Sequence, residues 1–260
     1  MNILQKIVAY KKQEVEAAKK LVPEQVLRSF PAFQRSVHSM SKALRNSETG
    51  IIAEHKRRSP SRSVINQSHG VDQIVQAYQS GGASAISVLT DSRFFGGSLQ
   101  DLALARDLTD LPLLRKEFVI DPYQLIEAKA YGADAILLIA AILSTKELSE
   151  LSATARDLGL EILVEVHNSE ELERSRAQDI HMLGVNNRNL KTFEVSISTS
   201  VELIDQIPQQ VVPISESGIS DPQSVKELKQ AGYQGFLIGE NFMKAEEPGR
   251  ALTEFLNATQ

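Results

Sequence analysis

The segment "IIAEHKRRSPS", residues 51–61, contains the pattern on which the fold prediction rests. A short apolar run ends there in a carboxylate and a row of cations, and hydroxyl residues around a proline follow at once. Side chains at positions i and i+2 of a strand share a face, so Glu54 and Lys56 lie together while Arg57 points toward the other side. Pro60 indicates that the strand ends before Arg58 can return to the first face. We therefore predict a buried strand whose carboxyl end carries a Glu–Lys pair.

Seven further short apolar runs follow along the chain. Each is shorter than a typical helix, and most are rich in Ile, Val and Leu, which is typical of parallel strands buried on both faces. They cover residues 83–90, 111–116, 133–140, 161–166, 181–187, 211–217 and 235–240. Stretches with helical spacing separate them, and several of these begin at a capping residue (Asp121, Ser144, Asn168, Asp221) and end at glycine (Gly81, Gly132, Gly159, Gly232). The pattern predicts eight strand–helix units.

Eight such units after a helical N-terminal extension, residues 1–47, predict an α/β fold of the (β/α)8 TIM-barrel class. The length of 260 residues suits one such barrel or two ordinary domains. No linker or low-complexity tract divides the chain, so we expect a single domain over residues 1–260. A doubly wound open sheet is the alternative, but its glycine-rich dinucleotide turn is absent after the first run.

Composition and charge limit the possible partners. The formal net charge of −5 argues against general attraction to nucleic acid or membranes. The absence of Cys excludes disulfides, thiolate metal sites and cysteine nucleophiles. No signal peptide is evident, and the longest apolar run, residues 135–143, is far shorter than the roughly 20 residues of a membrane span. The sequence offers no evident metal site, a cytoplasmic location fits the absence of Cys, and we expect a monomer rather than an oligomer.

Charged or amide side chains end six of the eight runs, at the end where such barrels place their chemistry. Singly, each has a structural explanation: Glu54 and Lys56 as an ion pair, Lys116 as a solvated loop residue, or Arg188 as a clamp on a carboxylate. Their alignment at one end of the barrel favours an active site. The set comprises Glu54, Lys56, Lys116, Glu165, Asn186, Arg188, Glu216, Ser217, Gly239 and Glu240.

Glycines after the seventh and eighth runs predict an anion site. "ESGIS" (216–220) and "IGEN" (238–241) occupy the positions where barrels bind phosphate through loops and a short helix. Gly218 and Gly239 have no Cβ, so backbone N–H groups there can approach an anion closely. We interpret "FFGGS" (94–98) as the turn and lid after the second run. His55 and His167 are interpreted as wall or loop residues rather than ligands, because neither has a second His close in sequence.

Together the motifs resemble those of the indole-3-glycerol-phosphate synthase family of tryptophan biosynthesis. The matching segments are "IIAEHKRRSPS", "AISVLTDSRFFGGSLQDL", "LPLLRKEFVIDPYQ", "LVEVH", "GVNNRNLKTF", "ISESGIS" and "FLIGENFM", in the family's order. The resemblance implies a (β/α)8 barrel and a cofactor-free lyase. Its phosphorylated substrate is 1-(2-carboxyphenylamino)-1-deoxyribulose 5-phosphate, which loses carbon dioxide and water as the pyrrole ring closes to give indole-3-glycerol phosphate.

The resemblance also implies catalytic roles for five residues. Lys116 matches the general acid that helps the ribulose carbonyl accept the aromatic ring. Glu165 matches its acid/base partner in the later dehydration. Lys56 matches the cation that meets the substrate carboxylate, and Glu54 orients these groups. Asn186, with Arg188, matches the pair that holds the anthranilate part and tunes Glu165.

The remaining implied residues bind substrate. Glu216 and Ser217 would face the sugar hydroxyls, and the backbone at Glu240 would join two glycines around the phosphate. The full substrate-binding set is Arg188, Ser59, Ser61, Phe94, Glu216, Ser217, Gly218, Gly239 and Glu240. The sequence departs from the family pattern at Ser63, Glu117 and His55, and each departure affects the expected loop geometry.

Two other functions remain open. One is a different phosphate-binding barrel, such as a phosphoribosyl isomerase or the tryptophan synthase α-subunit type. Those need a different placement of acid and base, which the Glu-x-Lys of the first run and Lys116 in the third argue against. The other is a non-catalytic barrel, which the presence of all matched polar residues disfavours.

Overall fold

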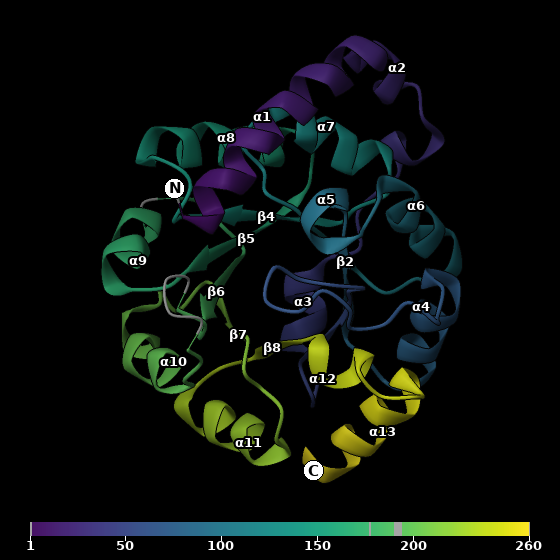
Figure 1. The fold of residues 1–260 in the computed structure, drawn as a ribbon. Coiled ribbons are helices and arrows are strands. Elements are labelled where there is room, and N and C mark those ends of the chain that lie inside the picture. The colour runs from purple at the N-terminus through teal and green to yellow at the C-terminus, as the bar shows by residue number, and fades with distance from the viewer. Residues whose placement is uncertain (1, 177, 190–193, 260) are drawn as a thin grey trace.

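The computed structural model describes residues 2–176, 178–189 and 194–259, so the last part of the quoted motif, residues 190–193, lies outside the described residues. Within these ranges, parallel strands close a barrel in chain order, β1-β2-β3-β4-β5-β6-β7-β8 (Figure 1). Each strand falls inside one of the predicted apolar runs. The strands are β1 (Ile51–His55), β2 (Ala85–Leu89), β3 (Leu113–Lys116), β4 (Ala135–Ile139), β5 (Glu161–Val166), β6 (Met182–Asn186), β7 (Val212–Glu216) and β8 (Gly235–Ile238).

Helices follow the strands and surround the barrel. They are α4 (Val71–Ser80), α5 (Ser92–Phe95), α6 (Leu99–Leu108), α7 (Pro122–Ala130), α8 (Thr145–Asp157), α9 (Ser169–Arg176), α10 (Ser198–Leu203), η2 (Ile204–Gln206), α11 (Pro222–Ala231), α12 (Glu240–Met243) and α13 (Pro248–Thr259). The predicted caps are present: the carboxylate of Asp121 accepts a hydrogen bond from the N–H of Tyr123, and Ser144 forms a capping box with Glu147. None of the described helices is long and apolar enough to cross a membrane.

Alternation along each strand separates two cores. Inward-facing side chains fill the barrel, and outward-facing ones pack against the helices. On β1, Ile52 belongs to the inner core while Ile51 and Ala53 belong to the outer one. The same alternation brings Glu54 and Lys56 above Ile52, at the carboxyl end of the strand, where both line a cavity.

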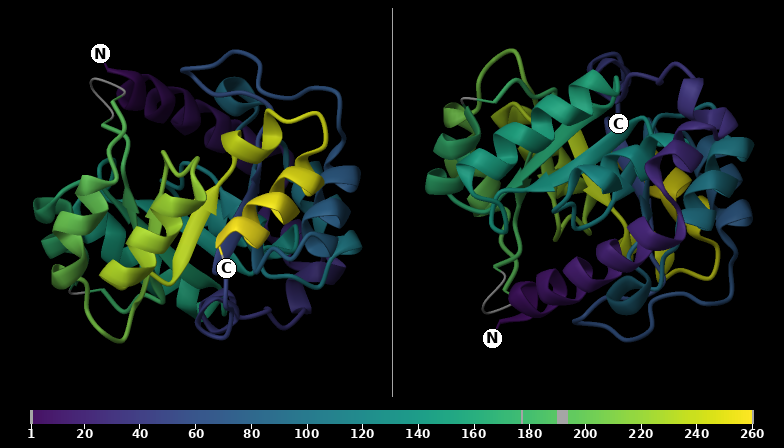
Figure 2. Two further views of the ribbon diagram at one scale, coloured as in Figure 1. Left: turned by 90° about the horizontal axis from the view of Figure 1, so that it is seen from below. Right: turned by 90° about the horizontal axis from the view of Figure 1, so that it is seen from above.

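The extension covers both ends of the barrel, as Figure 2 shows. It comprises α1 (Ile3–Leu21), α2 (Glu24–Arg28), η1 (Pro31–Gln34) and α3 (Met40–Arg45). Helix α3 closes the amino end of the strands, where Met40 and Leu44 join the inner core. The Glu161 carboxylate at the start of β5 accepts hydrogen bonds from the N–H and hydroxyl of Ser41, at 2.8 and 2.7 Å. Helix α1 crosses the opposite, carboxyl end, so the extension lies directly over the predicted site.

Candidate active site

A cavity of about 350 Å³ opens at the carboxyl end of the strands. One side of its lining comes from α1, through Ile3, Leu4 and Ile7. The strand ends and the loops after them supply the rest. Of the predicted site residues, the cavity lining contains Glu54, Lys56, Ser59, Ser61, Lys116, Glu165, Asn186, Arg188, Glu216, Ser217, Gly218, Gly239 and Glu240. The structure therefore brings together residues spread over nearly 190 positions of sequence.

Phe94 is the predicted site residue that lies outside this lining, and its neighbour Phe95 takes its place. The carboxylate of Asp91 caps α5 by accepting hydrogen bonds from the backbone N–H groups of Phe94, at 2.7 Å, and Phe95, at 3.2 Å. In this turn the ring of Phe94 packs edge-on against Tyr10, with centroids 6.0 Å apart. The ring of Phe95 lies 5.8 Å from that of Phe118, which also lines the cavity.

Lys116 lies at the centre of the charged groups. Its ammonium is 2.8 Å from the Glu216 carboxylate and is also an ion-pair partner of Glu165, at 3.7 Å, and of Glu54, at 3.8 Å. Burial alone would favour the neutral amine, but the three carboxylates outweigh it and raise the pKa of Lys116. Lys116 is therefore an ammonium that carries its proton into the cavity.

Glu216 has the opposite electrostatic character. It is 1% exposed, and one carboxylate oxygen, Oε1, has no hydrogen-bond partner among the described residues. Burial raises the pKa of Glu216; Lys116 lowers it and the charge of Glu165 raises it again, with a result of about 7. Gly184 on β6 makes room for this carboxyl group, because a Cβ there would lie 2.1 Å from Oε1.

The charged residues after β1 point in the directions predicted by strand alternation. Lys56 pairs with Glu54 inside the cavity at 2.6 Å. Although burial opposes ionisation, Lys56 and Lys116 lower the pKa of Glu54 and keep it a carboxylate. Arg57 points outward and donates to Asp101 of α6 at 2.8 Å. Arg58 donates to backbone carbonyls of α5, so Lys56 is the cation of this segment that enters the cavity.

The loops after β6, β7 and β8 complete the lining. The side-chain oxygen of Asn186 accepts the N–H of Arg188 at 3.0 Å, which fixes the start of the β6 loop. After β7, Ser217 (φ 68°) and Gly218 (φ 75°) are both left-handed, a strained arrangement for serine that is common at functional sites.

The absence of a Cβ at each glycine also makes room for a neighbouring side chain of the protein. A Cβ on Gly218 would lie 2.1 Å from Val195, and a Cβ on Gly239 would lie 2.6 Å from the Glu54 carboxylate. Both glycines are needed for contacts within the protein, while their backbones still line the cavity.

The structure shows where the three residues that depart from the family pattern lie. His55 faces the helices and is buried in the barrel wall, as predicted, where burial and the charge of Arg57 lower its pKa to about 4. Ser63 is exposed in the loop after β1. Glu117 is buried; its carboxylate accepts a hydrogen bond from the hydroxyl of Thr90 at 2.8 Å and forms an ion pair with Lys11.

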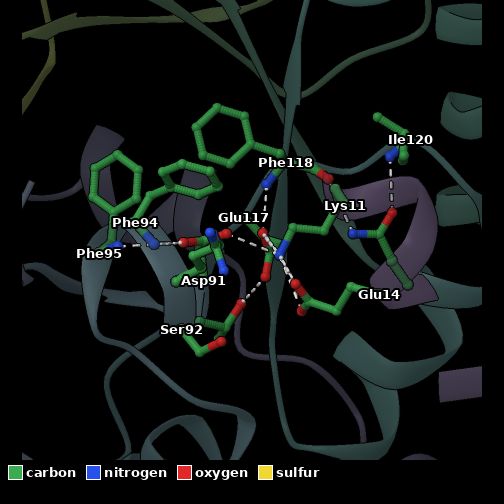
Figure 3. A network of polar contacts seen from close by, with 12 residues as sticks. Lys11, Glu14, Asp91, Ser92, Phe94, Phe95, Glu117, Phe118 and Ile120 are labelled. Carbon is green, nitrogen blue, oxygen red and sulfur yellow. Dashed lines mark hydrogen bonds and ion pairs between the residues drawn. The ribbon is translucent and has the colours of Figure 1, made fainter. Parts of the chain in front are cut away.

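Lys11 of α1 was not predicted as part of the site. Its side chain is 1% exposed, and its ammonium lies 3.0 Å from Asp91, 3.0 Å from Glu117 and 3.1 Å from each oxygen of Glu14 (Figure 3). Burial favours the neutral amine, but these carboxylates prevail and raise its pKa. Lys11 thus ties α1 to the loops that follow β2 and β3, beside Lys116. No local sequence pattern indicates this, because both loop partners are far from Lys11 in sequence.

Within the described residues, no group of three or more His, Asp or Glu side chains is arranged to hold a metal ion.

The fold has many known counterparts. A thiamine phosphate pyrophosphorylase from Pyrococcus furiosus superposes with a TM-score of 0.63 at 16% identity, covering 85% of this chain and 98% of that one. A tryptophan synthase α-subunit variant from the same organism superposes with a TM-score of 0.62 at 17% identity, covering 81% and 97%. At these identities the likeness concerns the fold alone.

Sequence relatives are much closer. The family model for indole-3-glycerol phosphate synthase matches residues 4–255. A relative of that name from Bacteroides thetaiotaomicron is 49% identical and covers 100% of this chain and 99% of its own. Another, from Salinibacter ruber, is 44% identical and covers 97% and 94%. The chain therefore belongs to the indole-3-glycerol phosphate synthase family.

Proposed function

We propose that the cavity at the carboxyl end of the barrel is where this chain closes the pyrrole ring of 1-(2-carboxyphenylamino)-1-deoxyribulose 5-phosphate, with loss of carbon dioxide and water. The observation that carries the proposal is the position of Lys116, a protonated ammonium held against Glu216, Glu165 and Glu54 inside the cavity. The volume of the cavity, about 350 Å³, is within the range of pockets that enclose a small organic ligand.

The reaction needs protons at two places. Ring closure requires a donor at the ribulose carbonyl oxygen, and dehydration requires one at the leaving hydroxyl. Lys116 suits the first step, because its three carboxylate neighbours keep it charged until the carbonyl oxygen develops negative charge. Glu165, 3.7 Å from Lys116, suits the second as an acid/base that takes a proton from the ring and delivers one to the hydroxyl.

The substrate carries a carboxylate, an aromatic ring and a phosphate, and the cavity has a complement for each. Lys56 and Arg188 supply cations for the benzoate carboxylate, which must be held while the ring develops positive charge. Phe95 and Phe118 offer an aromatic wall. The backbones of Gly218, Gly239 and Glu240, with the hydroxyls of Ser59 and Ser61, would receive the phosphate and sugar.

Fluorescence tests this directly, because the indole product emits differently from the anthranilate substrate. Purified protein should convert the substrate, and Lys116→Met should lower kcat by at least about 10²-fold, the scale of general acid catalysis. KM should change much less. Turnover by Lys116→Met at a rate close to wild type would exclude the assigned acid. We also propose that residues 1–260 form one domain and act in the cytoplasm as a monomer. Light scattering on the purified chain can test the monomer.

A further inference from the structure

Glu165 has a second cationic neighbour outside the substrate cavity. Its Oε2 is the oxygen that faces Lys116, at 3.7 Å, while its Oε1 lies 3.5 Å from Nε2 of His167. His167 directly follows β5 and does not line the substrate cavity. Instead it lines a polar side pocket that adjoins the cavity at Asn186 and Arg188. Each oxygen of the carboxylate thus faces a different nitrogen.

His167 is itself fixed by α9. Its Nδ1 lies 3.1 Å from Oε2 of Glu171, and the same oxygen accepts the backbone N–H of His167 at 2.8 Å. Asn168 holds the other oxygen of Glu171 by donating from its side-chain amide at 3.0 Å. The ring is 10% exposed, and its Nε2 has no hydrogen-bond partner among the described residues. This buried nitrogen makes no hydrogen bond, yet it faces the carboxylate proposed as the acid/base of the reaction. The arrangement indicates a function for the ring.

The surroundings favour the imidazolium form of His167. Burial favours the neutral ring, but the hydrogen bond to Glu171 and the charges of Glu165, Glu171 and Glu216 prevail and raise the pKa of His167 above 6.5. Among the described residues that line the side pocket, the charged groups besides Glu171 are Arg188 and Glu194. In the imidazolium both ring nitrogens carry a proton, so Nδ1–H donates to Glu171 while Nε2–H points to Glu165.

We infer that His167 is a positioning residue for Glu165: its imidazolium orients that carboxylate and places a positive charge beside it, with Glu171 as the anchor of the ring. This rests on the acid/base role proposed above for Glu165. His167 touches no substrate and transfers no proton in the reaction. It acts by charge, because an opposite charge within about 4–6 Å stabilises a carboxylate.

Kinetics over pH can separate this role from simple packing. His167→Asn should move the acidic limb of kcat/KM to higher pH, since the acid/base carboxylate loses a neighbouring cation. KM at pH 8 should stay within about twofold, because the ring is outside the cavity. Glu171→Gln should move the same limb in the same direction, and the double variant should shift no further than His167→Asn, because both changes act through one ring. His69→Asn, in the loop before α4, is the matched control and should superpose on wild type.

The ring can also be observed without turnover. In NMR titration of wild-type protein, the His167 signal should titrate above pH 6.5, and Glu171→Gln should lower its pKa. This NMR experiment tests the inference even if the His167→Asn variant does not fold. A wild-type His167 that titrates below 6.5, an unshifted acidic limb in the variants, or additive shifts in the double variant would each overturn the inference. Loss of the acid/base assignment would show differently: Glu165→Gln would keep full activity while the His167 titration remained as expected.

Discussion

Replacing Glu216 by Gln should make the protein more stable at alkaline pH, although Glu216 forms the shortest ion pair of Lys116. Glu216 is 1% exposed, and its carboxylate shares the cavity with Glu165 and Glu54. Burial and these charges raise its pKa from the ordinary 4.5 to about 7, despite the attraction of Lys116. A glutamine has nearly the same shape and carries no charge, so it removes the cost of ionising this position.

The sign and size follow from proton linkage. Between pH 4.5 and about 7 the folded protein retains a proton on Glu216 that the unfolded chain has lost. Stability therefore falls as pH rises through this window. One pKa unit corresponds to about 1.4 kcal/mol, so the ionised form costs the folded state on the order of 3 kcal/mol. Most of that cost develops above pH 5. We expect the stability of Glu216→Gln, relative to wild type, to improve by about 2–3 kcal/mol from pH 5 to pH 8.

Urea unfolding at both pH values measures this difference. Glu54→Gln is the matched control, because Glu54 lies in the same cavity and shares Lys116, yet Lys56 and Lys116 lower its pKa despite burial. A carboxylate with a lowered pKa stabilises the fold above its ordinary pKa, so Glu54→Gln should destabilise the protein at pH 5 and pH 8 alike. A relative stability of Glu216→Gln that is equal at the two pH values, or lower at pH 8, would refute the reasoning.

The other predictions concern single contacts. Lys56→Ala should reduce kcat/KM strongly, whereas Arg57→Ala should act mainly on the melting temperature, because Arg57 pairs with α6 outside the cavity. Lys11→Met should cost about 3–5 kcal/mol in urea unfolding, since it leaves buried carboxylates without their cation, and should expose α1 to limited proteolysis. Gly239→Ala should lower kcat by displacing Glu54, and calorimetry should show inorganic phosphate binding changed much less.

The strands and the end of the barrel that holds the site could be predicted because both depend on short-range patterns. Alternation along one strand decides that Ile52, Glu54 and Lys56 face inward while Arg57 faces a helix. Closure of eight parallel strands then brings all their carboxyl ends together. The same alternation predicts that Phe118, two positions after Lys116, also faces the cavity, which it does. Phe118 was not among the predicted site residues.

The missed features depend on contacts between distant segments. Lys11 appears in the sequence as one lysine of an amphipathic helix, and only folding places it between Asp91 and Glu117. The choice of Phe95 over Phe94 depends on a single turn of α5. The sequence also does not show which side chain lies behind each glycine; behind Gly239 it is Glu54.

The N-terminal helix α1 covers the charged cavity, and the charges beside the cavity hold α1 in place. A site that uses Lys116 as an acid and Glu165 as an acid/base gains from exclusion of water, because charges interact more strongly in a low-dielectric interior. Exclusion also raises the cost of the extra carboxylate at Glu216. Helix α1 supplies the apolar cover through Ile3, Leu4 and Ile7, and Lys11 holds that cover by neutralising two further buried carboxylates beside the cavity. Because Lys11 neutralises Asp91 and Glu117, the cover is fixed by charge without leaving uncompensated anions beside a site that must admit a phosphate and a benzoate.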